Sequence, residues 1–214
     1  MVALSSNASP LRPVAQVGTR VRLLLLAPGD DNAAGVDLDT GGLVWAKWNP
    51  DDSNIVPIGL RPLDVVTAQT HVNPPLPDPA RPEGVALAAA PVAIGRLRGR
   101  RAERLLRPLH HPERDQLLGF AGPAVPYWTL AGDRPSMAVV APRGPVVLTP
   151  TADGLAVRFT WRAAQHELPC TDPAADSVVA SHGGPVKAAR RLLVTLSEPY
   201  LGHCYKVVTA LLPA

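Results

Sequence analysis

The stretch that decides the fold is DGLAVRFTWR, residues 153–162. Leu155, Val157, Phe159 and Trp161 alternate with polar residues, so they share one face of an extended strand. Asp153-Gly154 supplies a tight turn just before the strand begins. A half-buried strand that follows such a turn is typical of antiparallel sheet, and the sequence around it repeats this pattern.

Further strands are expected on both sides of this stretch, with helical pattern only between them. The expected strands are Thr19–Ala27, Val36–Leu38, Leu43–Trp48, Leu63–Gln69, Ser136–Ala141, Val146–Thr149, Arg191–Leu196 and Tyr205–Leu211. The expected helices are Arg100–Arg107, with a Glu103–Arg107 pair on its outer side, and Pro112–Leu118. Strands, a helical patch and strands again predict two small β units rather than alternating βαβ layers.

Composition supports a mainly β protein with stiff connections. The 214 residues are 46% hydrophobic, which is enough for a buried core, and 25 prolines disfavour long helices. Five of these prolines lie between Asn73 and Glu83, which predicts an extended strap or linker. Residues 1–13 are expected to form a flexible tail. Because no signal peptide or long apolar run is seen, we expect a cytoplasmic protein without membrane contact.

Several motifs, taken in order, resemble the dual OB-containing domain family of bacterial proteins. They are Arg22–Leu26, Ala34–Leu38, Gly42–Trp45, Leu63–Val66, Phe159–Trp161, His166–Pro173 and Leu196–Val208. The resemblance implies two small OB-like β-barrels, at residues 14–98 and 120–214, joined by the proline-rich strap and a helical connector at 99–119 with short Arg-rich helices. It also implies a place in prokaryotic defence complexes.

One loop departs from that family. Relatives carry a basic, cysteine-containing loop after the first strand, whereas residues 28–34 of this chain read PGDDNAA. A contact made through the basic loop in relatives is therefore lost or changed here.

OB folds bind oligonucleotides or oligosaccharides on an exposed strand face and its loops. Single-stranded nucleic acid would need cations for phosphates and aromatic rings for bases. The candidate contact residues are Arg96, Arg98, Arg100, Arg101, Arg104, Arg107, Lys47, Trp45, Arg158, Arg162, Tyr205 and Lys206. The six arginines at 96–107 are opposed only by Glu103, although a solvated helix or an acidic protein partner would explain them as well.

Catalytic chemistry has little support in the sequence. The motifs G-x-S-x-G, H-E-x-x-H and G-x-x-x-x-G-K-[ST] are absent, and His166 with Cys170 lacks the paired spacing of a structural zinc site. We expect a non-catalytic binding module with no metal and no cofactor. Its partner is single-stranded DNA or RNA bound without base specificity, or alternatively a protein in a larger complex.

Overall fold

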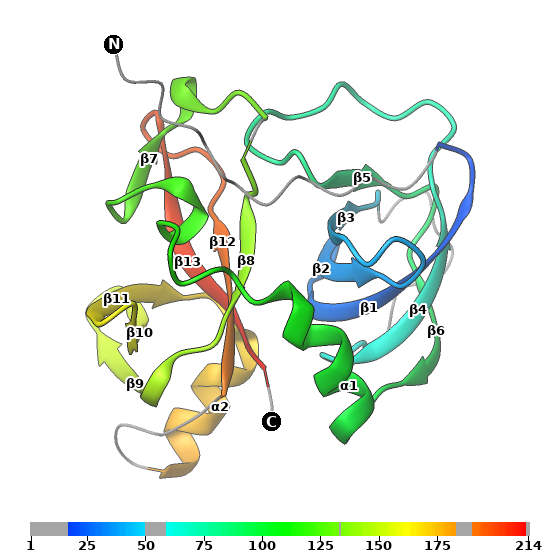
Figure 1. The fold of residues 1–214 in the computed structure, drawn as a ribbon. Helices are drawn as coiled ribbons and strands as arrows, with labels where there is room; N and C mark the ends of the chain where they lie inside the picture. Colours follow the sequence, from blue (N-terminus) through cyan, green and yellow to red (C-terminus); the bar gives the residue numbers. More distant parts are fainter. Residues whose placement is uncertain (1–16, 50–58, 133, 183–189, 213–214) are drawn as a thin grey trace.

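The computed structural model describes residues 17–49, 59–132, 134–182 and 190–212. The expected tail at 1–13 lies outside these ranges. The protein is mainly β, as predicted, and its strands form two sheets that lie next to each other with one helix below their junction (Figure 1). No helix in the described part of the chain has the length and apolar character needed to cross a membrane.

The first sheet comes from the N-terminal half of the chain. Its strands are β1 (Arg20–Pro28), β2 (Asn32–Asp37), β3 (Leu43–Lys47), β4 (Asp64–Gln69), β5 (Gly84–Ala86) and β6 (Val92–Arg96). They lie in the order β5-β3-β2-β1-β4-β6, and only the β3–β5 pair is parallel.

The second sheet comes from the C-terminal half. Its strands are β7 (Ala124–Pro126), β8 (Met137–Val140), β9 (Arg143–Thr151), β10 (Gly154–Trp161), β11 (Ala164–Cys170), β12 (Arg191–Leu196) and β13 (His203–Leu212). The order is β8-β12-β13-β11-β10-β9, with β7 paired to β13 and with β11–β13 as the parallel pair.

Neither hydrogen-bonded path closes into a barrel within the described residues. In both sheets, however, the two edge strands are neighbours in the chain. Strands β5 and β6 end the first path and are separated by residues 87–91, whereas β8 and β9 end the second and are separated by residues 141–142. Thr70, which follows β4, and Leu87, which follows β5, form a single antiparallel β-bridge.

Three apolar cores hold the molecule together. One lies within each sheet, and the third joins Leu24 and Leu26 of β1 to Val139 of β8 and Leu193 of β12. Strand β1 is therefore buried on both faces, because its residues 21, 23 and 25 belong to the first sheet's own core. This explains why its sequence alternates at the start and then becomes continuously apolar.

The proline-rich strap is tied to both sheets. The Ala80 side chain is buried in the core of the second sheet, and the buried Glu83 carboxylate accepts hydrogen bonds from the Ser136 backbone N–H (2.8 Å) and hydroxyl (2.7 Å). The Glu83 carbonyl in turn accepts from Trp45 N–H on β3 (3.0 Å). The strap thus crosses between the sheets as a packed connection.

The helices match the expectation only in part. They are α1 (Gly99–Leu106), α2 (Pro173–His182) and the 3₁₀ turns η2 (Arg107–Leu109), η3 (Leu117–Gly119) and η4 (Tyr127–Thr129). Helix α1 and the hairpin of β12 with β13 are confirmed. The expected helix at 112–118 is wrong, since residues 112–116 are non-helical and only the short η3 follows. Strands β5, β6 and β11 and helix α2 were not expected.

Candidate nucleic-acid interface

Helix α1 is fixed on the core between the two sheets. Ala102 and Leu106, one turn apart, are 4% and 1% exposed and pack with Leu24, Val139 and other residues of that core. Pro108, two residues past the end of the helix, disfavours its continuation. The opposite side of the helix therefore has a defined direction, away from both sheets.

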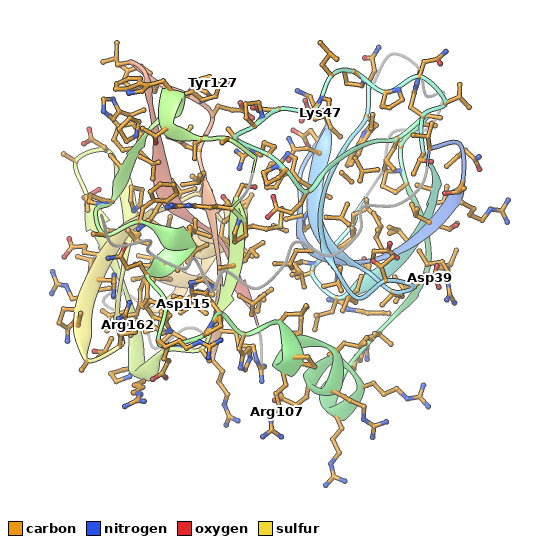
Figure 2. All side chains as sticks on the ribbon, turned by 45° about the horizontal axis from the view of Figure 1, so that its top comes forward. Asp39, Lys47, Arg107, Asp115, Tyr127 and Arg162 are labelled. Atoms are coloured by element: carbon orange, nitrogen blue, oxygen red, sulfur yellow. The ribbon has the colours of Figure 1, made fainter. Side chains whose placement is uncertain are left out.

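Five arginines lie on or beside that outer side, and we call them the arginine ridge. All five are exposed: Arg98, Arg100, Arg101, Arg104 and Arg107. Arg100, Arg104 and Arg107 are spaced by four and three residues, so helical geometry places them along one face. Figure 2 shows Arg107 extending into solvent at the α1 end of the molecule, far from Lys47 and Tyr127.

The ridge is electrostatically unbalanced. Among the described residues, no carboxylate forms an ion pair with any of its five guanidiniums. The expected Glu103–Arg107 pair is wrong, because the Glu103 carboxylate pairs with Nη2 of Arg191 on β12. Arg191 is largely buried and also donates to Nε2 of His110 (3.0 Å). The Glu103 carboxylate is therefore bound to a buried arginine and does not neutralise the ridge.

The N-terminal part of the ridge also opposes the electrostatics of its own helix, whereas Arg104 in the last turn complements the C-terminal end. The first turn of α1 contains no acidic residue, and Arg98 at the N-cap makes no side-chain capping bond. Cations near a helix N-terminus and like charges four residues apart are each unfavourable by a few tenths of a kcal/mol. A bound anion would relieve both effects, so the ridge is suited to phosphate groups.

Arg96 lies near the ridge but has other partners. It belongs to the edge strand β6, where Nη2 donates to the Pro62 carbonyl (3.1 Å) and Nε lies 3.6 Å from the Asp64 carboxylate. Its guanidinium is thus held against β4, and the sixth arginine of the expected cluster is partly neutralised.

Trp45 and Lys47 lie on β3 and do not join the ridge. The Trp45 ring is half-buried, and the guanidinium carbon of Arg81 lies 4.5 Å from its centroid. A buried arginine of the strap therefore occupies one face of the ring, and the expected base-stacking role of Trp45 stays a prediction for what remains exposed. Lys47 is exposed, and Trp48 is buried in the first sheet's core.

Two further candidate contacts, Arg158 and Arg162, already have partners within the protein. Arg158 makes a cross-strand ion pair with Glu167 of β11 (2.9 Å). Arg162 follows the end of β10 in a turn with φ of 53°, where Nη1 donates to the Asp115 carbonyl (2.7 Å). The Arg158 guanidinium is thus paired with a carboxylate, and the Arg162 guanidinium is bound to the segment 99–119 that connects the two halves.

Tyr205 and Lys206 point to opposite sides of β13. Tyr205 is 37% exposed, whereas Lys206 is 3% exposed and its ammonium donates to the Phe120 carbonyl. Burial lowers the Lys206 pKa to about 8. The expected surface role of Lys206 is therefore wrong. The alternation of Cys204, Lys206 and Val208 along the strand was the signal that would have placed it inside.

The local sequence does not indicate the burial or exposure of several other functional side chains. Arg81 and Glu83 lie in a proline-rich segment that suggests exposure, yet burial lowers the Arg81 pKa and raises the Glu83 pKa. Trp128 lies on η4 and is 71% exposed, which an isolated aromatic in a turn does not reveal. Within the described ranges, no three His, Cys, Asp or Glu residues are grouped so that they could hold a metal ion.

Comparison of this chain with protein-family models, with curated proteins and with solved structures finds no match.

Proposed function

We propose that this protein is a non-catalytic, OB-like module that binds single-stranded DNA or RNA through the phosphate backbone, with the arginine ridge as the main contact. The observation that carries the proposal is the set of five exposed guanidiniums on or directly beside one short helix, without a carboxylate partner among the described residues. Backbone contacts of this kind carry no sequence information, so binding is sequence-tolerant.

The order of the strands supports the OB-like part of the proposal. In each half, the third of three consecutive antiparallel strands pairs parallel with the strand two places further along the chain: β3 with β5, and β11 with β13. The two edge strands of each sheet, β5 with β6 and β8 with β9, would together form one bent strand. Each half would then be a five-stranded, partly open barrel. Helix α2 lies between β11 and β12. If β8 and β9 count as one bent strand, β11 is the third strand of the second barrel, and α2 follows it.

The arrangement of charges distinguishes the ridge from several other exposed arginines. The basic residues Arg22, Arg143 and Arg158 are also exposed, but each of them pairs with a carboxylate. The ridge has no such neutralisation, and its charge is available to release counterions from a nucleic acid.

Fluorescence anisotropy with labelled dT20 and rU20 at low salt tests the proposal. The logarithm of the binding constant should fall with the logarithm of salt concentration with a slope of about −3 if four or five phosphates are neutralised. Replacing Arg100, Arg101 and Arg104 by Glu should abolish measurable binding. Absence of wild-type binding at tens of micromolar protein, or binding indifferent to salt, would refute the proposal.

A matched control separates the ridge from net charge. Arg20, Arg61 and Arg114 are exposed and do not belong to α1, so their replacement by Glu changes the charge equally. This control should retain most of the affinity. Equal loss in both triple variants would show that overall charge, rather than the ridge, attracts the oligonucleotide.

The alternative is a scaffold subunit whose ridge docks on an acidic protein. It predicts no oligonucleotide affinity and a stoichiometric partner that co-purifies with the wild type but not with the ridge variant. The same variant thus distinguishes the two functions through different measurements.

A further inference from the structure

A second exposed surface lies at the end of the molecule opposite to α1, and we call it the aromatic patch. It consists of Trp128, Tyr200, Leu201, His203 and Tyr205. Trp128, Tyr200 and Leu201 are 71%, 67% and 80% exposed. In Figure 1, β7 and the loop between β12 and β13 lie at the top of the second sheet, whereas α1 lies at the bottom.

The patch is rigidly built. The carbonyl of Gly202 accepts a hydrogen bond from Tyr127 N–H (2.9 Å), which holds η4 against the β12–β13 loop. Gly202 has φ of 78°, and a Cβ there would lie 3.1 Å from Cζ3 of Trp128. The Trp128 and His203 rings meet edge to face at 5.5 Å, and His203 lies 6.5 Å from Tyr205.

The charge of the patch differs from that of the ridge. The segments that form it, residues 124–130 and 197–205, contain no lysine or arginine and one carboxylate, Glu198. The Glu198 side chain is 76% exposed, and its one ion pair with a described residue is a 3.8 Å contact with Nη2 of Arg81. Asp78 lies beneath the patch and accepts a 3.4 Å hydrogen bond from the Tyr127 hydroxyl.

This combination argues against nucleic acid and for a cationic protein side chain. Base stacking on aromatic rings is normally combined with cations that follow the phosphates, and the patch has none. Tryptophan and tyrosine faces attract arginine and lysine, and an exposed carboxylate adds a charge-assisted hydrogen bond. Exposed tryptophan and tyrosine in one place are also typical of protein-interaction hot spots.

We propose that the aromatic patch, with Glu198, binds a protein segment that presents an arginine or lysine flanked by apolar residues. The cation would lie against the exposed rings and the Glu198 carboxylate, and Leu201 would contact the apolar flanks. Because the patch and the ridge use different elements, this surface does not depend on the proposed nucleic-acid function.

NMR titration of the full chain tests the proposal, since four tryptophans give only four indole N–H signals. Trp128→Phe assigns the signal of the patch. The probe is a synthetic heptapeptide with one arginine between two leucines, and its control has glutamate in place of that arginine. We expect the Trp128 signal to shift with the arginine peptide alone, with Kd near about 1 mM or below.

Variants define the contact. Glu198→Gln should weaken the peptide about three- to tenfold and Tyr200→Ala by at least as much, whereas the triple ridge variant should bind it unchanged. No shift at about 5 mM peptide, or an equal shift with the glutamate peptide, would overturn the proposal. A shift of the Trp128 signal caused by dT10 would instead identify a base-stacking site. A shift that depends on protein concentration without any ligand would identify self-association. Either outcome would also overturn the proposal.

Discussion

Lys206 offers the sharpest test of the packing inside the second sheet. Its side chain is 3% exposed, and its ammonium has the Phe120 carbonyl as its described acceptor. Two nearby groups, His111 and His166, are themselves basic: burial lowers the pKa of both, and the Lys206 charge lowers it further. A charged amine in such surroundings is costly to bury.

The magnitude follows from the pKa. Burial lowers the Lys206 pKa from 10.5 to about 8, and this shift corresponds to about 3 kcal/mol against the charged form. At pH 7 both the folded and the unfolded chain are protonated, so the full cost is present. Between pH 8 and 10.5 the unfolded state binds more protons, so stability rises with pH. The gain between pH 7 and 9.5 is about 2 kcal/mol.

Lys206→Met removes this dependence. At pH 7 we expect the variant to be about 1–2 kcal/mol more stable, because the relief of about 3 kcal/mol exceeds the cost of leaving the Phe120 carbonyl without its donor. Urea unfolding followed by tryptophan fluorescence at pH 7 and 9.5 measures it. The wild type should gain about 2 kcal/mol more than Lys206→Met over this interval, and the exposed Lys47→Met should behave as the wild type does. Equal gains in wild type and Lys206→Met would refute the argument.

Three further substitutions test α1 and the first sheet by urea unfolding. Arg100→Glu should stabilise the protein by about 0.5 kcal/mol at low salt, and by less at high salt, because it places an acid in the first turn. Glu103→Gln should destabilise it by about 1–3 kcal/mol, since it leaves the buried Arg191 without its carboxylate. Gly35→Ala should cost about 2 kcal/mol, because a Cβ there would lie 2.8 Å from the Leu24 carbonyl oxygen.

The sequence predicted those elements whose burial pattern is local. Alternation placed Val157, Phe159 and Trp161 on one buried face and Arg158 outside, and the structure has them so. Strand β5 spans only three residues and exists through parallel pairing with β3, about forty residues earlier in the chain. No local pattern of that length can predict such a contact.

The same distinction between local patterns and long-range contacts explains which features of the candidate site the sequence could predict. The exposure of the ridge could be predicted because Ala102 and Leu106 fix the inner side of a short helix. The partner of Glu103 could not, since the local i,i+4 rule favours Arg107 while tertiary packing brings Arg191 to it. Lys206 differs for another reason: its position near a turn favours exposure, whereas the alternation of β13 places its side chain inside.

The ridge and the aromatic patch stand at fixed positions on one framework. Helix α1 is seated on the core that both sheets share, and the patch belongs to strands β7 and β13 of the second sheet. The strap adds a connection, because Arg81 lies over Trp45 of β3 and also contacts Glu198 beside the patch. If both proposals hold, one chain would keep a nucleic acid and a protein partner at opposite ends of a rigid body.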